Sequence, residues 1–420
     1  MRYIRLSELD FSDYVRPGDS VICGQGTAEP YSLTDQLMRD APAIGSFDLF
    51  VGAVFSRTFL TETAESVRFR SYGAIGNAVE LARRGTLDIV PYHYSNLYHA
   101  FDRGTERADV VLIQLCGNKT TGFNMGLAND YVGRAAARAR FVIAEVNPRV
   151  PWTVGAELPS DINIDLVVEV DWEPLELALA KVGLVEQQIA ARVASLIPDG
   201  AALQLGIGSI PDAVLSGLGG HRNLGLHSGA IGDRAVGLIE RGIITNSCKS
   251  INQGVSVCGS LFGTRCLYDF AHQNPALHVL PASYTHALVN MAQLSNFTAV
   301  NSAIEVDLSG QVNAEIAGNT AVGAVGGQVD FVRGANASPG GRAIIALPST
   351  AKNGTVSRIV PVVQSVTCAR SDVDAIATEW GVAELRGLGL ATRAERMIEI
   401  AAPQFREGLA RAAYDQKRYS

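Results

Sequence analysis

The stretch PDGAALQLGIGSIPDAVL, residues 198–215, decides the fold that we expect for this chain of 420 residues. It predicts a turn at Asp199 and then an apolar strand from Ala202 to Leu205, because a short apolar run bounded by turn residues is typical of a buried strand. Two glycines, Gly206 and Gly208, follow directly. The stretch therefore predicts a strand that ends in a glycine loop.

A helix is expected to begin where this loop ends. Pro211 has a preset φ that suits the first turn of a helix, and Asp212 places a carboxylate at its positive end. The apolar residues Ala213, Val214 and Leu218 follow. A strand, a glycine loop and a helix start form a platform where backbone N–H groups can meet an anion or a developing oxyanion.

Composition indicates a compact α/β enzyme of two domains. The chain has 47% hydrophobic residues, 42 glycines and only 18% charged residues, and its length exceeds one ordinary core. The net charge of −7 argues against a nucleic-acid partner, although a local basic pocket for a phosphorylated ligand stays compatible with it. The six cysteines include no CxxC pair, so the sequence predicts neither a disulfide framework nor a metal site. Most cysteines are expected to be small core residues.

We expect neither a targeting segment nor a membrane-spanning segment in this sequence. Charged residues interrupt the apolar runs at the N-terminus, and no stretch reaches the ~18 apolar residues of a membrane span. We therefore expect a cytoplasmic protein without a membrane partner.

Strand-like runs alternate with helical stretches, which is typical of a mostly parallel sheet with both faces covered. In the first half these runs are 47–54, 87–91, 110–115 and 141–146. An acidic, proline-containing connection follows, and a helix is expected from about Val185 to Leu196. We expect an N-terminal domain of residues 1–183 and a C-terminal domain of residues 184–420.

Several motifs together identify a family. The central stretch resembles DGATLQLGIGxIPxAV, which opens the second domain of the acetyl-CoA hydrolase/4-hydroxybutyrate CoA-transferase family of class I CoA-transferases. NSAIEVDLSGQVN (301–313), VGGQVDF (325–331), KNGTVSRIVP (352–361) and TEWGVAELRG (378–387) resemble further family motifs. The resemblance implies two tandem α/β domains of the NagB/RpiA-like type, with the active site between them.

The resemblance also nominates residues that bind coenzyme A. The family loop that corresponds to 325–331 lies beside CoA, which implies that Gly326 and Gly327 approach the ligand closely, while Phe331 is expected to pack. Lys352 is expected to reach the phosphates or the pantetheine of CoA, and Glu379 to line the same pocket. Gly206 and Gly208 complete the predicted CoA-binding set. We expect this site chiefly in the second domain.

In the first half, DSVICGQGTAEP (19–30) predicts a strand and a glycine loop that ends at Glu29, and its Glu-Pro ending matches the family. CGNKTTGFNMG (116–126) and AEVNPRVP (144–151) match only in part. Phe123 and Asn124 depart from the family pattern, which indicates an unusual acyl side of the pocket. Stretch 301–313 predicts a β-hairpin that turns at Ser309-Gly310, in which Glu305 and Asp307 face away from the apolar side and have a structural role.

The family works through a glutamate that attacks the acyl-CoA and then carries CoA as a thioester. This glutamate follows the loop proline by about eighteen positions, which corresponds to Gly229 in LGLHSGAIGD (224–233). Glycine has no carboxyl group, so the resemblance implies the fold and the CoA site but not this mechanism. We expect that the missing side chain leaves a space for water or for a bulkier acyl group.

Three functions remain open. The first, which we favour, is attack of water on an acyl-CoA, either as thioester hydrolysis or as C–C bond cleavage, with Glu29, His227 or Glu379 as general base. The second is a CoA-transferase whose nucleophile is Glu29 or Glu145. The third is a CoA-binding protein without turnover.

The expected partners follow from these alternatives. They are an acyl-CoA and in some cases a small carboxylic acid, with CoA as substrate or product and no tightly bound cofactor. A homo-oligomer, a dimer or a tetramer, is expected.

Overall fold

The computed structural model describes residues 1–415, and the chain packs into two compact units that each combine several segments. Unit 1 consists of Met1–Ala178, Val257–Thr285 and Thr320–Gly326. Unit 2 consists of Leu179–Ser256, His286–Asn319 and the residues from Gly327 onward. The assignment of 1–183 and 184–420 to two domains remains a prediction, and the structure adds that two later segments pack with the first half.

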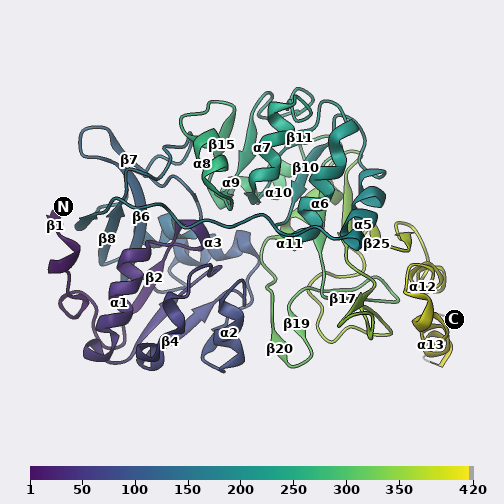
Figure 1. Ribbon diagram of the computed structural model, residues 1–420, viewed down its shortest axis with the longest axis horizontal. Coiled ribbons are helices and arrows are strands. Elements are labelled where there is room, and N and C mark those ends of the chain that lie inside the picture. Colours follow the sequence, from purple (N-terminus) through teal and green to yellow (C-terminus); the bar gives the residue numbers. More distant parts are fainter. Residues whose placement is uncertain (416–420) are drawn as a thin grey trace. The chain divides into compact units, whose positions relative to one another are not determined.

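Unit 1 is built on a parallel sheet with the strand order β1-β9-β8-β6-β2-β3-β4-β5 (Figure 1). The strands are β1 Arg2–Ile4, β2 Ser20–Cys23, β3 Phe47–Phe50, β4 Val67–Ser71, β5 Leu87–Ile89, β6 Val110–Asn118, β7 Gly122–Asn124, β8 Phe141–Val146 and β9 Leu166–Glu169. All neighbours along this order pair in parallel, and β7 alone turns back antiparallel on β6. The predicted parallel sheet is confirmed.

The central strands of this sheet are apolar and buried along their length, as parallel strands covered on both faces must be. Residues 110–116 of β6 are all buried, and Leu112 is inaccessible to solvent. The sequence did not predict the short strands β1 and β7, and it also missed β4 and β9. Arginines interrupt β4, and β9 lies within the stretch that was interpreted as the acidic connection. The helices of this unit are α1 Tyr31–Ile44, α2 Ala78–Arg83, α3 Tyr94–Arg103, α4 Tyr131–Ala136, α8 Arg265–Ala271 and α9 Ala282–Thr285.

Unit 2 contains a second sheet with the order β11-β10-β16-β21-β25-β26. Its strands are β10 Ala202–Leu205, β11 Gly225–Leu226, β16 Thr298–Ser302, β21 Arg342–Ala346, β25 Ala375–Thr378 and β26 Gly381–Glu384. Only the last pair is antiparallel. The parallel strands therefore carry their carboxyl ends to one edge, where ligands of such sheets bind.

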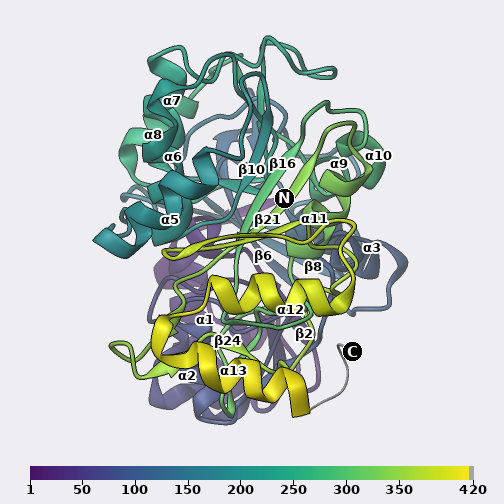
Figure 2. The same ribbon diagram turned by 90° about the vertical axis from the view of Figure 1, so that its right-hand side faces the viewer.

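Unit 2 has seven α-helices within its described residues, and the short helix α10 packs against the longer helix α11. They are α5 Leu184–Ala194, α6 Ser209–Gly217, α7 Asp233–Glu240, α10 Leu288–Met291, α11 Gln328–Ala337, α12 Leu390–Glu399 and α13 Pro403–Asp415. The last two lie side by side (Figure 2). The expected helix at 185–196 is confirmed as α5. None of the helices within residues 1–415 is long and apolar enough to cross a bilayer.

The predicted hairpin is confirmed as β17 Glu305–Asp307 and β18 Val312–Asn313, which pair antiparallel. Asp307 is nevertheless buried, with only 1% of its surface exposed. Its carboxylate accepts hydrogen bonds from the backbone N–H groups of Ser309 and Gln311 and so closes the turn. The structural role assigned to Asp307 agrees with these contacts.

Four of the six cysteines are buried, as the composition predicted. They are Cys23, Cys116, Cys258 and Cys368, whereas Cys248 and Cys266 are exposed.

Candidate active site

The glycine loop after β10 has the predicted form and begins α6 slightly earlier than expected. The helix starts at Ser209, so that Pro211 stands in its first turn. Gly208 is the N-cap and has a φ of +124°, a backbone conformation that side chains strongly disfavour. Gly206 has no such angle, and a Cβ placed on it would meet only Pro211, at 3.7 Å. The chain thus needs a glycine at 208 for its own geometry, but it does not need one at 206.

Gly229 follows β11, and the volume above it is filled rather than empty. A Cβ at this position would lie 2.9 Å from Nε2 of His286 and 3.1 Å from Cε2 of Phe331. The first distance is shorter than the contacts that real Cβ atoms make, and the second is tighter than most of them. An imidazole and a phenyl ring therefore pack directly against Gly229, and the expected space for water or a bulkier acyl group stays a prediction.

The same imidazole also lies against Gly327, the N-cap of α11. A Cβ there would be 2.7 Å from Nε2 of His286. The group that packs closely against Gly327 within unit 2 is therefore the side chain of His286. Its neighbour Gly326 belongs to unit 1, has a φ of +51°, and accepts a hydrogen bond of 2.9 Å from the backbone N–H of Tyr94. The CoA-binding role of both glycines remains a prediction.

Burial keeps the imidazole of His286 neutral. It lowers the pKa of this residue to about 3, and the nearby imidazole of His227 lowers it further in the same direction. His227, which the sequence nominated as a base, is completely buried, and its ring packs edge-on against Phe297 at 6.0 Å between centroids. The sequence did not nominate His286, because LPASYTH (280–286) contains no glycine loop or recognisable motif.

Glu379 follows β25 and is held in place by its neighbours. Its carboxylate accepts hydrogen bonds from the backbone N–H of Ser349 at 2.9 Å and from the hydroxyl of Ser349 at 2.5 Å. The indole N–H of Trp380 donates to the same hydroxyl, and the guanidinium of Arg192 donates to the backbone oxygen of Glu379. These contacts orient the carboxylate and occupy both of its oxygens.

Lys352 stands at the tip of a hairpin formed by β22 Thr350–Ala351 and β23 Val356–Ser357. It is exposed and adopts a left-handed backbone with a φ of +49°. Its backbone oxygen accepts a hydrogen bond from the hydroxyl of Thr355, which fixes the turn. The ammonium group is thus presented to solvent on an ordered turn, a placement compatible with its predicted role toward phosphate groups.

In unit 1, Glu29 is 1% exposed and begins the segment that leads into α1. Its carboxylate accepts hydrogen bonds from the hydroxyls of Thr34 at 2.8 Å and Ser56 at 3.0 Å. Burial raises its pKa to about 7, and these hydroxyls oppose the shift. Glu145 is fully buried nearby, accepts from the backbone N–H of Ser32, and also has a raised pKa because of burial. The two carboxyl groups thus belong to the buried framework at the start of α1.

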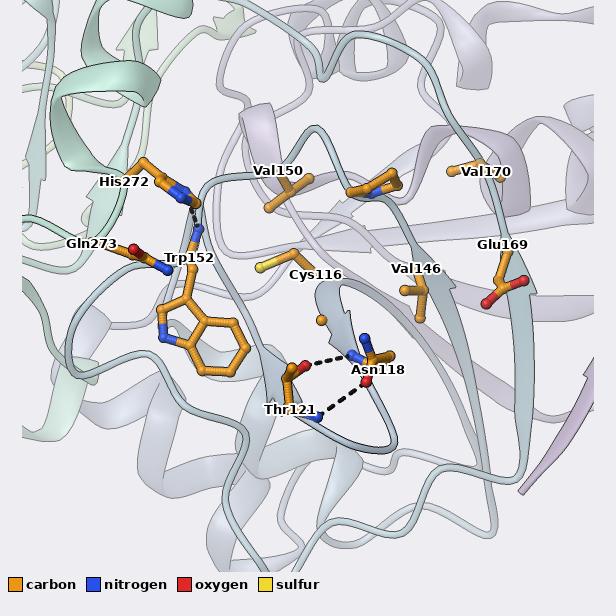
Figure 3. A pocket seen from close by; sticks show the side chains of 12 residues that line it. Cys116, Asn118, Thr121, Val146, Val150, Trp152, Glu169, Val170, His272 and Gln273 are labelled. Atoms are coloured by element: carbon orange, nitrogen blue, oxygen red, sulfur yellow. Dashed lines mark hydrogen bonds between the residues drawn. The ribbon is translucent and has the colours of Figure 1, made fainter.

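Unit 1 also contains a cavity of about 640 Å³ at the carboxyl ends of β6, β8 and β9. Figure 3 shows Trp152, Cys116 and Val146 along its apolar wall. Thr121 and Asn118 lie on one side, joined by hydrogen bonds between them. The loop expected to form the acyl side of a pocket therefore does line a cavity. Its acyl-binding role stays a prediction.

Asn124, in the same loop, makes hydrogen bonds to the backbone within unit 1. It is completely buried, and its side chain accepts from the backbone N–H of Gly126 and donates to the backbone oxygen of Thr153, both at 2.8 Å. An amide with these partners stabilises the loop from inside. The expectation of an unusual acyl side, based on Phe123 and Asn124, stays a prediction.

Comparison with known proteins agrees with this architecture. Residues 263–413 match the model of the acetyl-CoA hydrolase/transferase C-terminal domain. The 4-hydroxybutyrate coenzyme A transferase of Clostridium kluyveri is 39% identical over 395 residues, which cover 93% of this chain and 92% of that protein.

Two solved structures match nearly the whole chain. RipA from Yersinia pestis has a TM-score of 0.91 at 32% identity, covering 99% of this chain and 98% of that one. The 4-hydroxybutyrate CoA-transferase of Porphyromonas gingivalis has a TM-score of 0.84 at 32% identity, with the same coverage. The chain is therefore an enzyme of acyl-CoA chemistry that belongs to the acetyl-CoA hydrolase/4-hydroxybutyrate CoA-transferase family.

Proposed function

We propose that this enzyme hydrolyses an acyl-CoA by direct attack of water, without a glutamyl-CoA intermediate. The observation that carries the proposal is Gly229, which offers no carboxyl group at the position that the resemblance of the motifs assigns to the family's nucleophile. The packing of His286 and Phe331 over this glycine supports it, because a Cβ at 229 would require the imidazole of His286 to shift. Hydrolysis of a C–C bond in the acyl group uses the same attacking water and is a variant of this proposal.

A CoA-transferase with a relocated nucleophile is the second candidate. The similarity to a 4-hydroxybutyrate CoA transferase over most of both chains favours it. Glu29 and Glu145 are the carboxyl groups proposed for this role. Both residues are at most 1% exposed, so an acyl-CoA would have to reach buried groups. Burial also favours their protonated forms, which are poor nucleophiles. These features favour hydrolysis.

The two candidates differ in acceptor dependence and in covalent intermediates. The enzyme is incubated with acetyl-CoA, butyryl-CoA and longer acyl-CoA thioesters, with and without added acetate, and release of free CoA thiol is measured. Hydrolysis predicts thiol release that needs no acceptor acid. It also predicts that no CoA adduct appears as a mass increase on the protein and that borohydride reduces no carboxyl group of the protein. Acceptor-dependent transfer with an adduct on Glu29 or Glu145 would establish the second candidate, and no turnover of any thioester would count against both.

A further inference from the structure

We propose that the guanidinium of Arg358 binds an oxoanion of the substrate, which is either a phosphate group of CoA or the carboxylate of the free acid. Arg358 is not among the residues that the sequence nominated for CoA binding. The inference adds a binding residue to the proposed function. It rests only on the acyl-CoA chemistry of the family, so it holds whether water or a second acid accepts the acyl group.

The backbone of Arg358 is fixed on both sides. The residue lies between β23 and the short strand β24 Ile359–Val360. Its backbone N–H donates to the oxygen of Ser349 at 2.9 Å, and its backbone oxygen accepts from the N–H of Val306, also at 2.9 Å. Because both backbone groups are paired, the fold holds the base of this side chain in one place.

The contacts of Arg358 lie at the ends of three neighbouring strands. Nη1 donates to the backbone oxygen of Ala303 at 3.4 Å, and Ala303 directly follows β16. Ser349 comes shortly after β21, and Glu379, whose negative charge acts on the guanidinium, directly follows β25. These three strands pair in parallel, so the contacts lie at their carboxyl ends. Arg358 therefore stands at the edge of the sheet where ligands of such folds bind.

The positive charge of Arg358 has no close anionic partner. Within residues 1–415, no carboxylate comes within ion-pair distance of its guanidinium, and both carboxylate oxygens of Glu379 are occupied by Ser349. The side chain is half-buried, and burial lowers the pKa of Arg358, a shift that the charge of Glu379 opposes. A cation that is withdrawn from water without a partner is costly, and an anionic ligand offsets that cost.

Two nitrogens of the guanidinium have no acceptor in the described part of the chain. The oxygen of Ala303 is contacted by Nη1 alone, and Nε is buried without a partner. Nε and Nη2 therefore both remain unpaired. In a guanidinium these two nitrogens form a planar fork that matches two oxygens of a carboxylate or of a phosphate. The chemistry of the unpaired fork thus selects an oxoanion as the ligand.

The hairpin of β22 and β23 carries a second cation, the exposed Lys352 at its tip. Arg358 directly follows the second strand of this hairpin. Two cations on one hairpin suit a ligand with several phosphate groups, whereas a carboxylate needs only the fork of Arg358. The source of the oxoanion can therefore be identified by comparing ligands with and without phosphate.

The first test measures affinity by calorimetry for three probes: CoA, pantetheine, which has no phosphate group, and butyrate. If the oxoanion is a phosphate, Arg358→Gln is expected to weaken CoA binding by about tenfold or more and to leave pantetheine binding unchanged. If it is a carboxylate, the same variant weakens butyrate binding by that factor and leaves CoA binding unchanged. Either result supports the inference and identifies the source.

Two further variants separate the planar fork from charge alone. Arg358→Lys keeps the positive charge but loses the paired donors, so it should recover only part of the affinity. Arg333→Gln is the matched control, because it removes an exposed arginine of unit 2 that is paired with Asp372. This control should bind all three probes like the wild type. An equal loss in Arg333→Gln and Arg358→Gln would attribute the effect to net charge and overturn the inference.

The melting temperature separates binding from a structural role. Because Arg358→Gln removes a cation that has no ion-pair partner, the melting temperature of the ligand-free protein is not expected to fall. The rise in melting temperature that the bound oxoanion causes in the wild type should shrink in this variant. A lower melting temperature together with unchanged affinity for CoA and butyrate would show a structural role and overturn the inference.

Failure of this inference differs from failure of the proposed hydrolysis, because none of these measurements needs turnover. Unchanged affinity for both CoA and butyrate in Arg358→Gln overturns the binding role and leaves hydrolysis standing. Acceptor-dependent transfer through an adduct on the protein overturns hydrolysis and leaves the binding role of Arg358 in place.

Discussion

Met291 packs very closely on Gly334 of α11. A Cβ placed on Gly334 would lie 2.5 Å from the sulfur of Met291 and 2.8 Å from the Cβ of Met291. Met291 is fully buried. The distance between α10 and α11 is therefore set by a glycine, and with it the position of the segment that begins at His286.

We expect Gly334→Ala to push these helices apart. Overpacking of this kind costs about 1–3 kcal/mol of unfolding free energy. Chemical denaturation measures this effect. Gly237→Ala is the matched control, because Gly237 also lies within a helix but a Cβ there would meet nothing within 4 Å. If both variants behave alike, close packing at Gly334 does not matter.

The raised pKa of Glu29 predicts a pH-dependent stability. Its pKa is about 7 in the folded protein against 4.5 as the ordinary value, so the folded state binds more protons between these two pH values. Below pH 4.5 the carboxyl group is protonated in both the folded and the unfolded state, so it does not reduce the unfolding free energy. As the pH rises from 4.5 through 7, the unfolding free energy falls by up to about 3 kcal/mol, because the buried group resists ionisation in the folded state.

Glu29→Gln should remove this loss, since the amide keeps an acceptor for Thr34 and Ser56. The unfolding free energy of the variant is expected to fall less between pH 5 and pH 8 than that of the wild type. The exposed Glu62→Gln is the control and should follow the wild-type curve. Parallel curves for Glu29→Gln and the wild type would mean that Glu29 is already ionised at pH 5.

Substitutions at the two glycines of the loop after β10 can distinguish an effect on stability from an effect on CoA binding. Gly208→Ala forces a side chain into a φ of +124° and should destabilise the protein by about 1–3 kcal/mol. Gly206→Ala has room and should leave stability unchanged. If CoA approaches this backbone as predicted, Gly206→Ala nevertheless weakens CoA binding in calorimetry. Unchanged affinity in that variant removes Gly206 from the ligand site.

Lys352 offers a test of the predicted phosphate contact. Lys352→Ala should weaken CoA binding by about 1–3 kcal/mol, because a charge-assisted hydrogen bond to phosphate is lost, and the effect should shrink as salt is added. Stability should not change, since the side chain is exposed. Lys181→Ala removes another exposed lysine of unit 2 and should bind CoA like the wild type. Equal affinities in the two variants would place Lys352 outside the site.

The sequence predicted features that depend on local chemistry. The strand at Ala202–Leu205, the proline in the first turn of α6 and the hairpin at 301–313 are each encoded by neighbouring residues. The flanking residues of Gly229 resemble the family motif, so the sequence alone was enough to predict that this position lacks the carboxyl group.

Side-chain contacts between distant segments could not be read from the sequence. His286 is 57 positions from Gly229, and no periodicity relates the two. The burial of Asp307 was missed because alternation along a strand does not show that the turn beyond it needs an acceptor. The internal role of Asn124 likewise depends on Thr153, in a different part of the chain. Such contacts depend on the packing of each unit.

The composition of unit 1 from three separate segments has a consequence for how the protein is made. The buried hydroxyl of Thr27 donates a hydrogen bond of 2.6 Å to the backbone oxygen of Leu261, which lies 234 residues further along the chain. A ribosome that adds 5–20 residues per second therefore reaches this partner only after on the order of ten seconds or more. Until then the glycine loop beside Thr27 has been synthesised, but the segment that packs against it has not. Nascent chains arrested before residue 257 should accordingly be cleaved by protease near this loop, and chains arrested after residue 326 should be protected.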